Sequence, residues 1–70
     1  MKNNIRIERA IKAITQAELA ELIGVSRQTI NSIESGKYIP STVLALKIAF
    51  VFEHSVESIF SLDENDDHKL

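Results

Sequence analysis

Closely spaced helix boundaries in the middle of the chain require two short helices to be joined by a tight turn. Thr15, followed three residues later by Glu18, has the form of a capping box, which marks a helix start. Gly24 ends that helix, because glycine tolerates the positive φ that a helix end often needs. Ser26 caps the next helix and Gly36 ends it. The chain therefore reverses sharply between two helices.

Small and apolar residues occupy the positions that such a pair of helices requires. Two helices that cross steeply touch at one point, so one residue there must be small, and Ala20 lies in the middle of the first helix. Ile30 and Ile33 are one helical turn apart on the second helix, which must bury one stripe and expose the other. The pattern predicts a helix-turn-helix.

Helical signals also dominate the rest of the chain, which contains one proline, two glycines and almost no strand-like alternation. We expect three further helices, at about residues 4–12, 42–52 and 56–60, with Ser41 and Ser55 as the caps of the last two. The helix at 42–52 is apolar on almost every side and is expected to be central. The residues expected to be buried are Ala20, Ile23, Ile30, Ile33, Leu44, Ile48 and Ile59.

These elements predict an all-α fold, a compact five-helix domain over residues 1–62 with the helix-turn-helix at the second and third helices. At most, a short strand pairing joins the N-terminus to the segment around residues 60–62. Residues 63–70 are acidic and almost without apolar anchors, so we expect a disordered tail there.

Composition excludes several classes of function. The 70 residues contain no cysteine, which rules out disulfides and thiolate chemistry. No apolar run approaches the ~20 residues that span a bilayer, and the start lacks a signal peptide, so we expect a cytoplasmic protein away from the membrane. Neither histidine has metal-ligand spacing, and no serine has a histidine and acid arrangement. We predict no catalytic residue, metal, cofactor or small-molecule ligand.

The charge distribution permits a basic face although the net charge is −2. Residues 1–47 carry seven lysines and arginines against four acidic residues, whereas residues 48–70 carry one against six. Nucleic acid binds where basic residues gather on one side of a domain, so this asymmetry is compatible with a nucleic-acid partner.

The outer stripe of the second short helix is polar and mostly uncharged, whereas an ordinary solvated helix more often pairs Glu with Lys. Arginine bonds bidentately to guanine, and glutamine or asparagine to adenine, in the major groove. A helix N-terminus also favours phosphate oxygens. The stripe therefore indicates a DNA-reading surface, and an ordinary solvated face is the alternative. Its members are Ser26, Arg27, Gln28, Thr29, Asn31 and Ser32.

The stretch at residues 15–41 resembles the phage repressor/Cro (XRE-type) helix-turn-helix family of transcriptional regulators, and the likeness extends from about Ile5 to Phe60. The resemblance implies a compact domain without enzymatic activity whose third helix enters the major groove of double-stranded DNA. It further implies a sequence-specific transcriptional regulator that represses by occupying a promoter. Some members of the family are antitoxins, so the alternative is an antitoxin or another protein-interaction module built on the same fold.

Site residues follow from the resemblance by position. The base-reading positions are Arg27, Gln28 and Ser32. Thr29 and Asn31 flank them and share this role. The phosphate-contacting positions are Gln16, Ser26, Ser35 and Lys37. Arg9 and Glu34 fall where related repressors form a partly buried ion pair, and two unrelated surface charges are the alternative. Ala13 and Glu53 stand where relatives often have glycine, so we expect backbone strain at these two helix ends.

A homodimer on a palindromic operator is expected, because one recognition helix touches too few base pairs to single out a site in a genome. Val43 and Phe50 are seven residues apart on one helical face, and relatives usually carry polar residues there. Val56, Ile59 and Phe60 add apolar area, and the five together form the candidate dimer surface. The alternative is that Phe50 folds back against the first helix, at Ile7 or Ile11.

Overall fold

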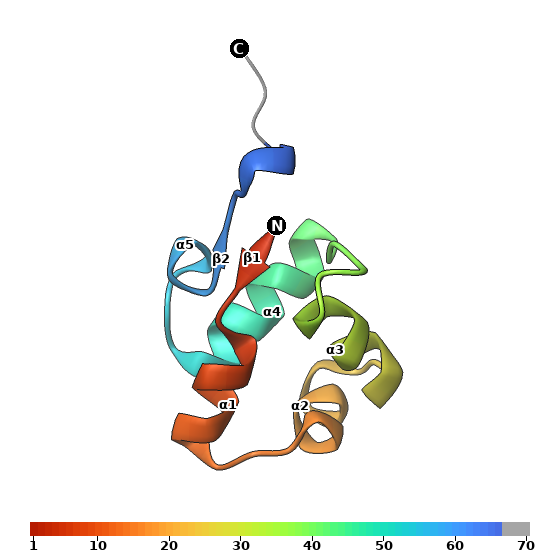
Figure 1. Ribbon diagram of the computed structural model, residues 1–70. Coiled ribbons are helices and arrows are strands. Elements are labelled where there is room, and N and C mark those ends of the chain that lie inside the picture. Colours follow the sequence, from red (N-terminus) through yellow and green to blue (C-terminus); the bar gives the residue numbers. More distant parts are fainter. Residues whose placement is uncertain (67–70) are drawn as a thin grey trace.

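The computed structural model describes residues 1–66 and contains the five predicted helices, with two short strands beside them. The two-residue strands pair in antiparallel fashion, with Lys2 opposite Ser61 and Asn3 opposite Phe60. In Figure 1, α2 and α3 lie on one side of α4, and α5 and the strand pair lie on the other. The elements are β1 (Lys2–Asn3), α1 (Ile5–Lys12), α2 (Gln16–Ile23), α3 (Arg27–Glu34), α4 (Thr42–Phe52), α5 (Val56–Ile59) and β2 (Phe60–Ser61). The five-helix prediction is confirmed.

Local capping sets the ends of α2 and the start of α3. The Thr15 hydroxyl accepts from the Glu18 N–H at 3.0 Å, and the Glu18 carboxylate accepts from the Thr15 N–H at 2.9 Å, which completes the capping box. Gly24 closes α2 in the left-handed region, with φ of 76°. The Ser26 hydroxyl then accepts from the Thr29 N–H at 3.1 Å. These contacts satisfy backbone groups that a short helix would otherwise leave unpaired.

The hydrophobic core lies where α2, α3 and α4 meet the strand pair. Six of the seven residues expected in the core are buried, and Leu44 is only half-buried. Leu46 is exposed as well, so the expectation of a helix surrounded by the core is wrong for part of α4. Although elements pack on two sides of α4, they do not cover Leu46. The buried apolar residues are Ile5, Leu19, Ala20, Ile23, Ile30, Ile33, Ile48, Ala49, Phe52, Ile59 and Phe60.

The end of α5 differs from the prediction. The helix ends at Ile59, and Phe60 begins β2. The Asn4 N–H donates to the Ile59 carbonyl at 2.8 Å, so pairing with the N-terminal segment takes over the backbone there. Ser55 precedes α5 as expected, but its hydroxyl lies 2.9 Å from the Ser58 hydroxyl and makes no bond to the helix backbone.

Residues 63–66, which composition placed in a disordered tail, have a defined conformation. Residues Glu64–Asp66 form a 3-10 turn, and the Asp63 and Asp66 carboxylates lie 2.9 and 2.8 Å from the Met1 amino group. These contacts raise the pKa of the amino group and lower the pKa of Asp63. The rest of the expected tail, residues 67–70, lies outside the described residues. Within residues 1–66, no helix has the length and apolar character needed to cross a membrane.

Two helix ends take the left-handed conformation without glycine. Ala13 closes α1 and Glu53 closes α4, each with φ of 57°. A Cβ in this region crowds the following carbonyl oxygen and costs ~1–2 kcal/mol. The strain foreseen from the sequence is therefore present in the backbone at both ends.

Ala13→Gly is expected to stabilise the protein by about 0.5–1 kcal/mol, because relief of the left-handed strain exceeds the added freedom of the unfolded chain. Ala13 is exposed, so the change removes no core contact. Urea denaturation measures the effect. Ala10→Gly, in the interior of α1, is the matched control and should destabilise by a similar amount. A loss of stability in Ala13→Gly contradicts the prediction.

Candidate nucleic-acid interface

The outer face of α3 carries three exposed polar side chains. Ile30 and Ile33 are buried on the inner side, so the opposite side of the helix faces away from the core. Arg27, Gln28 and Asn31 are exposed there, and Asn31 is one turn from each of the other two. All three carry hydrogen-bond donors, and the two amides carry acceptors as well. The structure therefore brings these three predicted base-reading residues onto one surface.

The other two predicted base-reading residues are less accessible. Ser32 is half-buried beside Gln28. Thr29 is also half-buried, and its hydroxyl lies 2.9 Å from the Ser26 hydroxyl at the start of α3. Thr29 lies beside the buried stripe of α3, so its hydroxyl contributes to the helix cap and not to the outer face.

The predicted phosphate-contacting residues surround this face. Gln16 is the first residue of α2, and Lys37 is exposed just beyond the end of α3. The Ser35 hydroxyl donates to the Ser32 carbonyl at 3.1 Å. The Ser26 hydroxyl accepts from the α3 backbone, as described above. Of the four residues, Lys37 has the side chain most free to reach a phosphate.

A shallow depression beside α3 includes a residue that sequence reasoning missed. It is lined by Ser26, Gln28, Thr29, Ser32 and Tyr38. The Tyr38 N–H donates to the Ser32 carbonyl at 3.2 Å, which holds the connector against the end of α3. The sequence signal for this residue is an aromatic side chain two positions after Gly36, in a connector whose turn requires no aromatic residue.

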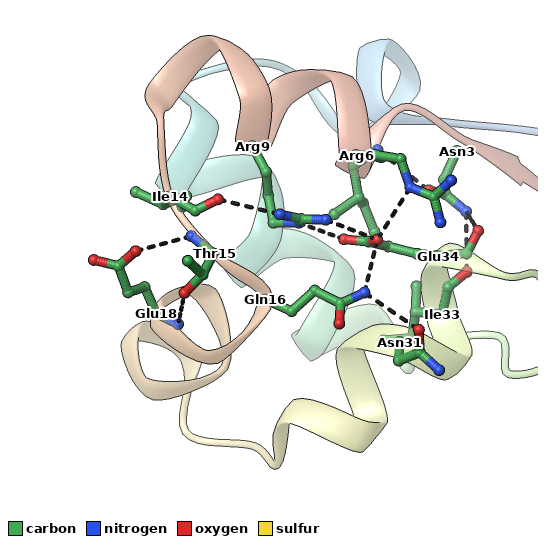
Figure 2. Close-up of polar contacts among 11 residues, drawn as sticks. Asn3, Arg6, Arg9, Ile14, Thr15, Gln16, Glu18, Asn31, Ile33 and Glu34 are labelled. Atoms are coloured by element: carbon green, nitrogen blue, oxygen red, sulfur yellow. Dashed lines mark hydrogen bonds and ion pairs between the residues drawn. The ribbon is translucent and has the colours of Figure 1, made fainter.

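Arg9 and Glu34 form a bidentate ion pair between α1 and α3 (Figure 2). The Arg9 Nε lies 2.6 Å from Glu34 Oε2, and its Nη2 lies 3.1 Å from Oε1. Arg9 Nη1 also donates to the Ile14 carbonyl at 3.1 Å. The Glu34 side chain is 1% exposed and that of Arg9 is 16% exposed. The pair is therefore shielded from water and connects α1 to α3.

Further side chains converge on Glu34, and sequence reasoning did not identify them as its partners. Gln16 Nε2 donates to Glu34 Oε1 at 3.0 Å, and Arg6 Nε lies 3.7 Å from the same oxygen. Asn3 Nδ2 donates to the Ile33 carbonyl at 3.0 Å, near the end of α3. No local pattern predicts such contacts, because 18 residues separate Gln16 from Glu34 and 28 separate Arg6 from it.

Electrostatics keep the Glu34 carboxylate ionised. Burial alone raises the pKa of Glu34, but the hydrogen bonds from Arg9 and Gln16 and the charges of Arg9 and Arg6 outweigh burial and lower it. The hydrogen bond to Glu34 raises the pKa of Arg9. Both groups are thus charged at neutral pH, as their geometry requires.

One face of α4 is apolar and exposed. Val43 is 64% exposed and Phe50 is 84% exposed, and Leu46 lies between them on the same side. We call these three residues the α4 face. Together with the exposed Leu22 of α2, they line a depression. Phe50 is too exposed to fold back against α1, so that alternative is excluded.

Two of the predicted dimer-surface residues prove to be core residues. Ile59 is 1% exposed and Phe60 is 7% exposed, because α5 and β2 turn both side chains inward. Val56 is half-buried and lines a second depression with Ile39, Leu46 and Phe60. The candidate surface is therefore reduced to Val43 and Phe50, with Leu46 added. Within the part of the chain that the structure describes, no three His, Asp or Glu side chains cluster as a metal site.

Comparison with known proteins gives a consistent result. Residues 5–53 match the family described as Helix-turn-helix. An uncharacterized HTH-type transcriptional regulator of Methanocaldococcus jannaschii is 48% identical over 66 residues, which is 94% of this chain and 100% of that protein. The HTH-type regulator YgzD of Bacillus subtilis is 44% identical over 66 residues, again 94% and 100% of the two chains.

A solved structure extends the comparison to the fold. The P22 c2 repressor protein, in complex with a synthetic operator, is similar with a TM-score of 0.73 and 28% sequence identity. The match covers 76% of this chain and 80% of that one. The chain therefore belongs to the helix-turn-helix family of DNA-binding transcriptional regulators, of the XRE type to which phage repressors are close.

Proposed function

We propose that this regulator is a sequence-specific repressor that binds an operator by placing α3 in the major groove. The observation that carries the proposal is the division of α3 into two faces. Ile30 and Ile33 anchor one face in the core, while Gln28 and Asn31 are exposed on the other. A rigid helix with exposed amides and an arginine matches the donor and acceptor pattern of base edges in the major groove. Repression needs only that the bound protein occupy the promoter.

Base readers and phosphate contacts have separate roles in this proposal. Gln28, Asn31 and Arg27 reach base edges and supply specificity. Lys37, beyond the end of α3, and the N-terminus of α2 at Gln16 contact phosphates on either side. Phosphate contacts set the register of the protein on the duplex but carry no direct sequence information.

We further propose that the working form is a homodimer assembled through the α4 face. A single α3 touches only a few base pairs, and a second copy doubles the specific contacts. Two-fold symmetry with recognition helices ~34–36 Å apart selects a palindromic operator. The α4 face supports this proposal because it leaves Val43, Leu46 and Phe50 in water, which association would remove.

Selection of bound sites from randomised duplex DNA tests the function directly. A repressor of this kind should enrich one palindromic sequence. A reporter gene with that sequence in its promoter should then be silenced by the protein and active without it. Failure to enrich any sequence contradicts specific binding, and increased reporter expression contradicts repression.

Gln28→Ala and Lys37→Ala should have different effects on the selected site. Gln28→Ala is expected to reduce specific affinity by about 1–3 kcal/mol and to relax the preference at one base position. Lys37→Ala is expected to weaken binding to all sequences alike and to flatten the dependence on salt. Titrations of the selected site and its single-base variants at several salt concentrations measure both effects. If Gln28→Ala leaves the preference unchanged at every position, Gln28 is not a base reader.

A further inference from the structure

Hydrogen bonds donated by Gln16 link the buried ion pair to the exposed outer face of α3. Gln16 Nε2 donates to Glu34 Oε1 at 3.0 Å and to Asn31 Oδ1 at 3.3 Å (Figure 2). Glu34 is buried against Arg9, Gln16 is half-buried at the start of α2, and Asn31 is exposed on α3. This chain of hydrogen bonds thus crosses from α3 to α2 and back, between the first residue of α2 and the last turn of α3, away from the turn that joins the two helices.

The chemistry of the carboxylate determines the direction of every bond in this chain. An ionised carboxylate only accepts hydrogen bonds, so the Gln16 atom that faces Glu34 must be the amide nitrogen. That nitrogen has two hydrogens, and the second one points to Asn31. The Asn31 atom that receives it must therefore be the oxygen. The nitrogen of Asn31 consequently remains as the end of its amide that is available to a partner outside the protein.

We propose that Glu34, acting through Gln16, fixes the Asn31 amide so that this residue meets DNA as a hydrogen-bond donor. The inference rests on the proposed function. The DNA group that Asn31 recognises is a hydrogen-bond acceptor. It is either a base atom, such as guanine O6, guanine N7 or thymine O4, or a phosphate oxygen. Gln16 is a positioning residue in this role, in addition to any phosphate contact of its own.

This arrangement removes an ambiguity that an exposed asparagine otherwise has. A free amide can turn over and present either its oxygen or its nitrogen to the groove, and both orientations fit some base. The hydrogen bond from Gln16 favours one of the two orientations over the other by about 2- to 13-fold. Preference at the Asn31 position therefore depends on a residue of α2 that does not itself reach the base.

Binding of four proteins to the selected site and its single-base variants tests the proposal. Wild type is compared with Asn31→Ala, Asn31→Asp and Gln16→Met. Asn31→Ala identifies the recognised group, because loss of preference at one base position indicates a base and uniform weakening indicates a phosphate. Asn31→Asp still accepts from Gln16 but presents an oxygen to DNA, so it should bind the wild-type site about tenfold more weakly or worse. If the group is a base, its preference should also move toward cytosine or adenine, which offer an amino group.

Gln16→Met keeps the size of the side chain and removes the hydrogen bonds. It should reduce the contribution of Asn31 by about threefold or more. A double-mutant cycle of Gln16→Met with Asn31→Ala should therefore be non-additive for either recognised group. Loss of a phosphate contact made by Gln16 itself weakens binding to all DNA sequences equally, so this effect cancels in the cycle. Circular dichroism of each variant serves as the control for folding.

The outcomes separate the two proposals. If wild type selects no site, the proposed function fails. If wild type selects a site but Asn31→Asp binds it as tightly as wild type does, Asn31 is not a donor and the inference fails. An additive double-mutant cycle also overturns the inference. So does a preference for adenine at the Asn31 position that is unchanged in Gln16→Met.

Discussion

Replacement of Glu34 with alanine is expected to lower the free energy of unfolding by about 3–5 kcal/mol, the cost of breaking a buried ion pair. The Arg9 guanidinium, only 16% exposed, then lacks its bidentate partner. Gln16 loses the acceptor for one of its amide hydrogens as well. A chain of this length has a total stability on the order of 4–10 kcal/mol, so the variant loses a large share of it.

Urea denaturation of Arg9→Ala, Glu34→Ala and the double variant measures this effect. Each single change should be costly, and the double change should cost much less than their sum. Lys12→Ala is the matched control, because its ion pair with Glu53, at 3.4 Å, is exposed and should contribute less than about 1 kcal/mol. Additive losses in the cycle contradict the pairing, and so does a loss in Glu34→Ala as small as that of the control.

The same pair predicts a dependence on pH. The pKa of Glu34 is lower in the folded protein than in the unfolded chain, so its ionisation stabilises the fold. That contribution is complete above the unfolded pKa of about 4.3 and is lost as the pH falls through the lowered folded value. The difference in stability between wild type and Glu34→Gln should therefore be constant near neutral pH and shrink in acid. A difference that grows on acidification contradicts the sign of the shift.

Phe50→Glu is expected to dissociate the proposed dimer and to weaken operator binding about 100-fold or more. The magnitude follows from the gain that two linked binding modules have over one, ~10²–10⁴. Phe50 is the most exposed large apolar residue of the described chain, so a charge at this position does not disturb the core. In the proposed dimer, Phe50→Glu places a carboxylate from each copy at the apolar contact, where burial of a charge is unfavourable.

Sedimentation equilibrium at micromolar concentration, with and without operator DNA, measures association. Circular dichroism should show that Phe50→Glu remains helical. Ile39→Glu is the matched control, because Ile39 is also exposed and apolar but lines the other depression. A wild-type protein that is monomeric both free and on its operator rules out the dimer. Dissociation by Ile39→Glu but not by Phe50→Glu moves the interface to the second depression.

Sequence reasoning placed most helix ends correctly because capping is a local interaction. Thr15 bonds to Glu18 and Ser26 bonds to Thr29, each only three residues away, so the partners are already neighbours along the chain. Gly24 takes a conformation that its own lack of a side chain permits. The outer face of α3 could be foreseen for a similar reason, because the stripe of isoleucines leaves only one side for water.

Burial along α4 and at the end of α5 was predicted less well. The apolar composition of α4 indicated a central helix, and Leu44 was expected to be buried. Leu44 is only half-buried against the core and Leu46 is exposed, because only a neighbouring element can cover a side chain. Phe60 was assigned to a surface, and Ile59 was assigned both to the core and to that surface, whereas the structure buries both side chains beside the β1–β2 pairing. Burial depends on what packs against a residue, and composition does not contain that information.

The helices, most of their caps, the motif and the exposed polar face of α3 follow from the sequence alone, because each depends on contacts within one or two turns of the chain. Only the tertiary structure decided that Glu34 accepts from Gln16, and thus which end of the Asn31 amide is free. It also decided that the apolar surface of α4 remains uncovered. Both results require segments distant along the chain to meet at particular angles. Such angles arise from the packing of the whole core and not from any local pattern of residues.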